Sequence, residues 1–451
     1  MPGVDLTLDW WWLYLQIALL SAIIVREVIR PRNRNLYAIL ITTTMLVLVQ
    51  GQAWWVLARF EQGNTAIRHL NQDISLDGAR LANLYLGLAV LCYCIALALP
   101  AANRGVTRVS TRVRSMLPET RLSYTMATIW TIVAGALLIQ GMGGLRTAVT
   151  SPGAAIAGLT ALLVATGLGK LPLLRRIATG GKPEIADVAI FGVAMLLTLI
   201  NSRFLAAFAL LQLALLLNYC WREAPRRSLL GLALGLVFIF IVYGLYRESA
   251  WRYGGVDLQK LSQLLVAPPE NDTVLDWFYR ANVEGFAGLA GLLTYESVNG
   301  PIAHDFGLSN LSIITQLLPN ALRNDPSLPF RDVARFLESL YPSSGSVVSP
   351  GPETAYAHFG LPGILGLGAL LGYLAGWLHA QMLNPRADRL KIALISVQSL
   401  NLVRSSFRNV IFFALADLAM LWIYRVMLTV GKRVRVAAIL ATKRKPQRAS
   451  G

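Results

Sequence analysis

The chain has 451 residues, of which 55% are hydrophobic and 14% are charged, and its mean hydropathy is +0.53. Soluble domains carry about 25% charged residues, so this composition excludes an ordinary soluble protein and indicates a membrane protein. The net charge of +17 would favour a nucleic-acid partner in a soluble protein. In a membrane protein the distribution of that charge over the loops matters more, and we expect no nucleic-acid partner.

Eleven apolar segments predict transmembrane helices, so the expected fold is an all-α polytopic membrane protein. The first segment, "WWWLYLQIALLSAIIV", has no basic residues before it and no small-residue cleavage site after it, which favours a retained span over a signal peptide. The tenth is short, which predicts a tilted, broken or re-entrant helix. The segments cover roughly residues 10–25, 36–58, 81–101, 123–142, 154–174, 185–201, 204–220, 229–247, 358–382, 391–403 and 409–430.

Basic residues are concentrated in alternate connections between these segments. "REVIRPRNR", "NRGVTRVSTRVRSMLPETR", "KLPLLRRIATGGKP", "WREAPRRS", "NPRADRLK" and the C-terminal tail together hold 26 of the 41 Lys and Arg residues. The positive-inside rule places these connections in the cytoplasm. We therefore expect a protein of the bacterial inner membrane, with the N-terminus outside and the C-terminus inside.

The predicted order divides the chain into spans 1–8 (residues 1–247), a large extracytoplasmic loop (248–355), spans 9–11 (356–430) and a basic cytoplasmic tail (431–451). The loop carries twelve Asp and Glu against six Lys and Arg, and it is longer than a structureless linker should be. Its stretch "TVLDWFYRANVEGFAGLAGLL" has apolar residues at roughly helical spacing, so we expect the loop to be partly helical. An extracytoplasmic cap without a catalytic role is the alternative.

Arginines on the predicted outer side oppose the positive-inside trend and are the first group of candidate binding residues. A charge within the membrane costs about 2.5–3.5 kcal/mol on insertion scales, so each needs a compensating role. Because Arg can bind phosphate with two parallel hydrogen bonds, several arginines facing one cavity suit a lipid-linked diphosphate. Snorkelling to the interface or pairing with a loop carboxylate is the alternative for each one. The group comprises Arg203, Arg247, Arg252, Arg280, Arg323, Arg404 and Arg408.

Asp417, in "FFALADLAMLW", is expected to lie within the membrane. We favour a role as a buried partner of Arg404 or Arg408 over that of a proton-coupling carboxylate. Lys170 is expected to snorkel toward the membrane surface.

Acid–base residues of the outer loop form the second group of candidates. The pairs His304–Asp305 and Glu353/His358 offer carboxylates and imidazoles, and either can deprotonate a sugar hydroxyl. A surface histidine without a catalytic role is the alternative for His304. The sequence contains no GxxxxGK[ST] loop, HExxH or CxxC motif, so we expect no ATP hydrolysis, no metal and no cofactor.

Four stretches resemble the O-antigen polymerase (Wzy-type) family of oligosaccharide repeat-unit polymerases. They are "LINSRFLAAFALLQLALLL", "WFYRANVEGFAGLAGLL", "HDFGLSNLSIITQLLPNALRNDPSLPF" and "SPGPETAYAHFGLPGILGLGALLGYLAG". The last is similar to the family's Glu-x-x-Tyr-x-x-Phe-Gly-x-x-Gly motif. The chain departs from the family at His358, where Asn is usual, and at Pro319, which Arg323 follows only four residues later.

The resemblance implies a fold like that of GT-C membrane glycosyltransferases and the transfer of a growing glycan from undecaprenyl diphosphate to the next lipid-linked unit. Its partners would be lipid-linked oligosaccharides, membrane lipid, a chain-length regulator and a flippase. The implied catalytic residues are Glu353, His304 and Asp305. The implied diphosphate- and glycan-binding residues are Arg203, Arg247, Arg280, Arg323, Arg404, Arg408 and Tyr356. An O-antigen ligase-like transferase and a secondary transporter are the alternative functions.

Overall fold

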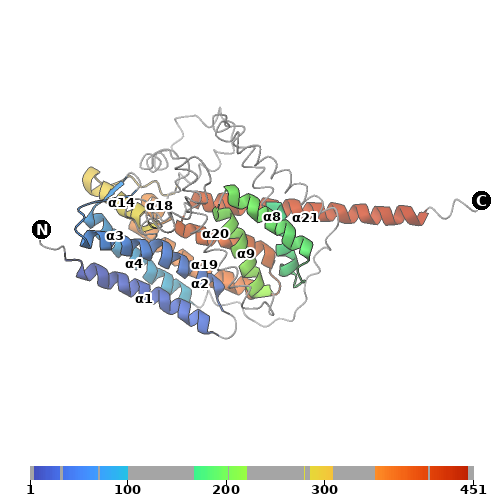
Figure 1. Cartoon of the computed structure of the whole chain (residues 1–451), viewed down its shortest axis with the longest axis horizontal. Coiled ribbons are helices and arrows are strands. Elements are labelled where there is room, and N and C mark those ends of the chain that lie inside the picture. The colour runs from blue at the N-terminus through green and yellow to red at the C-terminus, as the bar shows by residue number, and fades with distance from the viewer. Residues whose placement is uncertain are drawn as a thin grey trace, which may run out of the picture. The chain divides into compact units, whose positions relative to one another are not determined.

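The computed structural model describes residues 5–30, 34–69, 72–99, 167–201, 203–220, 279, 285–307, 351–404 and 407–444. These residues are largely helical (Figure 1). Among the described residues, five stretches are long and apolar enough to cross a membrane: Thr7–Ile29, Leu36–Glu61, Leu76–Ala98, Leu361–Leu383 and Phe413–Val434. The protein is therefore a predominantly helical, multi-pass membrane protein. The expected count of eleven spans stays a prediction, because segments 123–142 and 229–247 and most of 154–174 lie outside the described residues.

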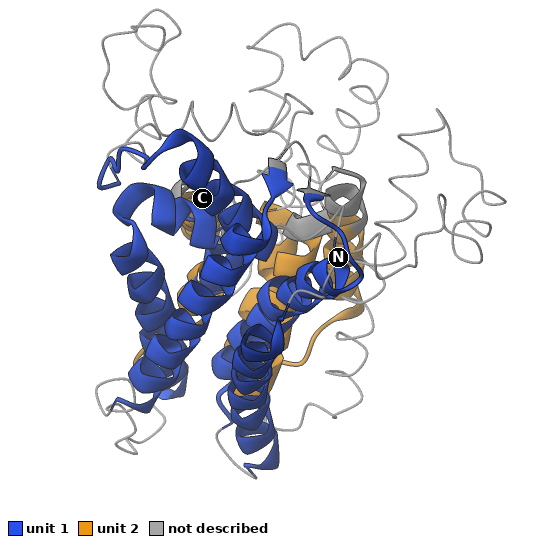
Figure 2. Cartoon of the chain, turned by 90° about the vertical axis from the view of Figure 1, so that its left-hand side faces the viewer, with its two compact units in different colours: residues 1–108, 249–384, 396–413 blue, residues 109–248, 385–395, 414–451 orange. Residues whose placement is uncertain are grey.

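The chain divides into two compact units (Figure 2). The first comprises residues 1–108, 249–384 and 396–413, and the second comprises residues 109–248, 385–395 and 414–451. Each unit thus combines segments that are distant in the sequence.

Four spans form the frame of the first unit. They are α1 (Thr7–Ile29), a continuous helix made of α2 (Leu36–Met45), the π-helix η1 (Leu46–Gln50) and α3 (Gly51–Glu61), then α4 (Leu76–Ala98) and α19 (Leu361–Leu383). Helices α4 and α19 pack closely because α19 presents glycines to the α4 backbone: a Cβ at Gly368 would collide with the Ala89 carbonyl, and one at Gly372 with the Tyr93 carbonyl. Small residues at such contacts are typical of helix pairs in membranes.

A short hairpin joins α3 to α4 within the first unit. Strands β1 (Ile67–His69) and β2 (Gln72–Ile74) pair antiparallel. The Ser75 side chain then begins α4 by accepting a hydrogen bond from the Gly78 N–H at 3.1 Å, as an N-cap residue does.

Two shorter helices, α14 (Gly285–Asn299) and α18 (Gly351–Phe359), pack inside the first unit. The sequence predicted one span over residues 358–382, whereas the structure ends α18 at Phe359 and begins α19 at Leu361. Gly360 lies between them with φ +64° and ψ −152°, a conformation that is essentially restricted to glycine. The break follows from this residue.

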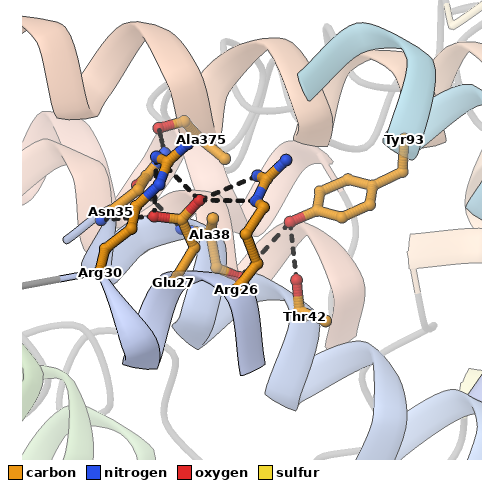
Figure 3. A network of polar contacts seen from close by, with 8 residues as sticks. All are labelled: Arg26, Glu27, Arg30, Asn35, Ala38, Thr42, Tyr93 and Ala375. Atoms are coloured by element: carbon orange, nitrogen blue, oxygen red, sulfur yellow. Dashed lines mark hydrogen bonds and ion pairs between the residues drawn. The ribbon is translucent and has the colours of Figure 1, made fainter. Parts of the chain in front are cut away.

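Where α1 ends and α2 begins, a buried carboxylate joins three helices (Figure 3). The Glu27 side chain is 1% exposed and forms ion pairs with Arg26 at 2.9 Å and Arg30 at 3.1 Å. It also accepts a hydrogen bond at 3.1 Å from the backbone N–H of Asn35, whose side-chain amide donates to the Ala375 carbonyl of α19. These contacts join α1, α2 and α19 at one end of the bundle.

The second unit contains helical residues 167–178, α8 (Ile185–Asn201), α9 (Arg203–Cys220), the first residues of α20 (Arg389–Arg404) and most of α21 (Phe407–Arg444). Within it, Lys170 Nζ forms an ion pair with Asp417 Oδ1 at 2.6 Å, and both side chains are 12% exposed. The Gln212 amide donates to Asp417 Oδ2 at 3.0 Å. Among the described side chains the structure thus pairs Asp417 with Lys170, whereas the sequence suggested Arg404 or Arg408, and the Arg408 side chain is not described. The snorkelling expected of Lys170 stays a prediction.

Candidate functional site

The end of α14, the segment 300–307 and helix α18 meet in the first unit and bring together several acid–base side chains. Helix α14 ends at Asn299, and Gly300 follows with φ +90°, which is the usual glycine-mediated helix end. Leu292 and Ala357 are fully buried where the two helices touch, with Ile302 and Tyr356 packed against them. This apolar contact fixes α18 beside the segment.

The segment 300–307 is held by the last turn of α18, whose carbonyl groups have no partners within the helix. The Phe306 N–H donates to the His358 carbonyl at 3.0 Å, and His304 Nδ1 lies 3.1 Å from the Ala357 carbonyl. A carbonyl oxygen can only accept a hydrogen bond, so Nδ1 of His304 carries the proton. In the neutral imidazole, Nε2 is then the basic nitrogen.

His358 and Asp305 form the shortest polar contact of the site. His358 Nδ1 lies 2.5 Å from Asp305 Oδ1, and the side chains are 3% and 18% exposed. The same carboxylate oxygen accepts the N–H of Gly307 at 3.0 Å. A carboxylate that accepts from Nδ1–H fixes the orientation of an imidazole and leaves Nε2 as the basic nitrogen. The two histidines are thus held in the same tautomer, one by a carbonyl and the other by a carboxylate.

Tyr356 and Glu296 form a second proton-bearing pair. The Tyr356 hydroxyl donates to Glu296 Oε2 at 2.6 Å, and Glu296 Oε1 accepts the backbone N–H of Ile302 at 2.9 Å. Burial raises the pKa of Tyr356 above its ordinary value, and the hydrogen bond to Glu296 raises it further. The phenol therefore stays protonated near neutral pH and acts as the donor. Its ring stacks on Tyr85 of α4, with centroids 6.1 Å apart.

Glu353 lies in the first turn of α18 and is 0% exposed. A carboxylate in the first turn is favoured by the positive end of the helix dipole. Gly351, which begins α18, packs so closely on the Leu402 carbonyl that a Cβ there would collide with it. The start of α18 therefore lies against the last turn of α20, which ends at Arg404.

The structure brings four of the sequence-predicted residues onto this framework. His304, Asp305 and Tyr356 belong to the cluster itself, and Glu353 lies one turn before Tyr356 on α18. Arg404 ends the helix that meets α18. Arg203 begins α9 and Arg408 lies near the start of α21, but their side chains are not described, and Arg247, Arg280 and Arg323 lie outside the described residues.

Two members of the cluster, Glu296 and the acid–base candidate His358, were not among the residues finally predicted to act in catalysis or binding. Glu296 gave no signal, because its partner Tyr356 is 60 positions away in the sequence. His358 was treated as a variation at a position where the resembled family has Asn. The signal that was available is its position five residues after Glu353, next to the Gly360 break.

Comparison of the chain with protein-family models, with curated proteins and with solved structures found no match. Within the described residues, no group of three or more His, Cys, Asp or Glu side chains is arranged to hold a metal ion. Chemically, the cluster can accept a proton at a histidine Nε2, hold the resulting charge beside a carboxylate, and donate a hydrogen bond from a phenol. These are the abilities that general acid–base catalysis needs.

Proposed function

We propose that this protein polymerises lipid-linked oligosaccharide repeat units at the outer face of the bacterial inner membrane. The observation that carries the proposal is the pairing of Asp305 with His358 and of Glu296 with Tyr356, beside the spans of a multi-pass membrane protein. Supporting it are the four stretches that resemble repeat-unit polymerases and the arginines predicted on the outer side.

The proposed reaction forms one glycosidic bond and breaks another. A hydroxyl of the acceptor sugar attacks the anomeric carbon of the donor glycan, the bond from that carbon to the diphosphate oxygen breaks, and undecaprenyl diphosphate leaves with the electron pair. A base removes the hydroxyl proton. We assign this step to Nε2 of His304, which is half-buried, whereas the complete burial of Glu353 fits a residue that orients the acceptor.

In the proposed mechanism the diphosphate is held by arginines. We assign Arg203 and Arg280 to the donor diphosphate, with Arg404 or Arg408 assisting, because guanidinium groups bind phosphate oxygens in pairs. Arg247, Arg323 and Tyr356 are assigned to the glycan and its lipid phosphates as further binding residues.

Complementation of a strain that lacks this gene tests the proposal. We expect His304→Gln, Glu353→Gln, Arg203→Ala and Arg280→Ala each to abolish long-chain glycan while leaving single-repeat glycan, and the exposed Asp77→Asn to restore full-length polymer. Full-length polymer from all four site variants would overturn the assignment. Accumulation of long lipid-linked chains in the gene-deleted strain would instead indicate a ligase-like transferase.

One observation favours a second function, that of a secondary transporter. Lys170 of the helix formed by residues 167–178 makes an ion pair with Asp417 of the apolar stretch Phe413–Val434, and Gln212 donates to the second carboxylate oxygen. Ionisable residues within membrane helices often mark ion or proton pathways. Uptake of an oligosaccharide into proteoliposomes that depends on a proton gradient, and that Asp417→Asn abolishes, would support transport over polymerisation.

A further inference from the structure

Helix α14 is buried in a way that the predicted outer loop does not explain. Nine consecutive residues, Gly285–Leu293, are buried, although the sequence places them between the spans and none belongs to a spanning stretch. A helix on the surface of a cap would keep one face exposed to water. The neighbours at each end of α14 show how far it reaches.

The beginning of α14 contacts the centre of a span. A Cβ at Gly285 would lie 3.0 Å from the Leu48 carbonyl and 3.3 Å from Val49 Cγ2, and Leu48 and Val49 are the central residues of the 26-residue span Leu36–Glu61. Gln52, which is 0% exposed, accepts hydrogen bonds from the N–H groups of Phe286 and Ala287, both at 2.9 Å. These are first-turn N–H groups that have no partner within the helix.

The other end of α14 lies where α4 begins. The Thr294 hydroxyl accepts the Ser75 N–H at 3.0 Å and lies 3.1 Å from the Ser75 hydroxyl, and Ser75 is the N-cap of α4. A Cβ at Gly78 would also collide with α14, at the Thr294 side chain and the Ala290 carbonyl. Thr294 is therefore at the edge of the membrane span, on the side where α3 ends and α4 begins.

The length of α14 between these two anchors matches half of a bilayer. Thr294 lies nine positions after Gly285, which is a rise of about 14 Å at 1.5 Å per residue. The hydrocarbon core is about 30 Å thick. A helix that begins within the hydrocarbon core has to be surrounded by protein, and its first N–H groups need hydrogen-bond acceptors. Gln52 is the acceptor for two of the four first-turn N–H groups of α14.

We propose that α14 is a half-helix that begins at the centre of the membrane and runs to its edge, and that Gln52 is a positioning residue which holds its first turn there. Gln52 acts on the acid–base cluster through α14, because Glu296 lies two residues beyond Thr294 and binds both Tyr356 and the Ile302 N–H. The position of α14 in the membrane does not depend on the proposed function. The effect of Gln52 on the reaction rests on the proposed function.

Cysteine cross-linking in native membranes tests the architecture without any activity. In a background with Cys92, Cys94 and Cys220 replaced by Ala, the pair Val49→Cys/Gly285→Cys reports the deep end and Ser75→Cys/Thr294→Cys the edge. We expect disulfides from both pairs. The edge pair in a protein that also carries Gly285→Ala shows whether a side chain at position 285 is compatible with folding. An edge disulfide in that protein together with failure of the deep pair would overturn the half-helix.

Substitution of Gln52 tests the positioning role. Gln52→Met and Gln52→Glu both remove the Nε2 group that donates to the Tyr279 carbonyl at 3.2 Å, and only Gln52→Glu retains an oxygen for the two N–H groups. With lipid-linked oligosaccharide extracted from the gene-deleted strain, we expect Gln52→Met to lower kcat about tenfold at unchanged KM and to reduce the deep cross-link, and Gln52→Glu to restore both. An unchanged deep cross-link and unchanged kcat in Gln52→Met would overturn the role. Wild-type protein that forms the deep cross-link but makes no polymer would refute the proposed function alone.

Discussion

The first unit holds paired carboxylates at both ends of its bundle, and the partners at the two ends differ in kind. Where α1 joins α2, Glu27 meets the guanidinium groups of Arg26 and Arg30 (Figure 3), which cannot lose their protons in a protein. Where α14 meets α18, Asp305 meets His358 and Glu296 meets a tyrosine. Imidazole and phenol can exchange a proton with their partners.

This difference separates a structural role from a chemical one. A carboxylate between two guanidinium groups has no partner that can exchange a proton with it, so its contacts only hold helices together. A carboxylate beside an imidazole can stabilise the imidazolium that forms when a base takes up a proton. Removing charge from the first end should therefore lower stability, whereas removing the Asp305 charge from the second end should lower turnover.

The largest effect is expected from removing both cations at the first end. Arg26→Gln with Arg30→Gln leaves a carboxylate that is 1% exposed without a cation, and breaking a buried ion pair in this way costs about 3–5 kcal/mol. Glu27→Gln should cost less, because the two arginines are half-exposed and can turn to water. Reversible unfolding in mixed micelles measures both values, and a larger loss for Glu27→Gln would contradict this account.

A smaller effect, on turnover only, is expected at Asp305. Asp305→Asn retains an oxygen for His358 Nδ1 and for the Gly307 N–H but removes a negative charge one residue away from His304, the proposed base, and a nearby negative charge favours the imidazolium. We expect polymer formation to fall about a hundredfold, within the range for loss of acid–base catalysis, while the unfolding temperature changes little. Asp77→Asn is the matched control on an exposed carboxylate. If Asp305→Asn instead lowered stability and left turnover normal, the contacts where α14 meets α18 would only hold the fold together.

Removal of the Tyr356 hydroxyl should have an effect on stability. Tyr356→Phe leaves Glu296 Oε2 without the donor now 2.6 Å away, and a hydrogen bond to a charged group contributes about 1.5–3 kcal/mol. The ring stacking on Tyr85 remains, so no cavity forms. Thermal unfolding in micelles measures the loss, and the double variant Tyr356→Phe/Glu296→Gln should recover part of it because no charge is then left unpaired.

The sequence predicted what local apolar patterns determine. All five spanning stretches coincide with expected segments, because about 20 apolar residues in a row have few alternatives. The break between α8 and α9 at Asn201–Arg203 was also visible in the pattern. Gly360 was not recognised as a break, because Phe359 and Leu361 on either side continue the apolar run.

Contacts between residues that are far apart in the chain could not be predicted from the sequence. Glu296 and Tyr356 are 60 positions apart, and Lys170 and Asp417 are 247 apart, so no spacing rule connects them. The burial of α14 could in part have been predicted, because "GFAGLAGLL" is apolar on every face and such a helix is surrounded by protein or lipid. It was missed because this stretch was treated as part of a longer helical segment of the outer loop.

The smallest effect is expected from Gly360→Ala, and it tests how closely the proton-exchanging end depends on backbone geometry. An alanine at φ +64° and ψ −152° costs about 1–2 kcal/mol, in the lower part of the range for such strain. Its Cβ would also lie 3.1 Å from Nε2 of His304, the nitrogen assigned as the base. The unfolding temperature and the polymer length should both decrease, because the backbone strain lowers stability and the added methyl group contacts the reacting nitrogen.

Gly63→Ala is the matched control, because Gly63 has φ +90° and nothing lies within 4 Å of its added Cβ. We expect it to lower stability by a similar amount and to leave polymer length unchanged. Equal polymer from the two glycine variants would remove His304 from the reaction and leave it as the cap of α18.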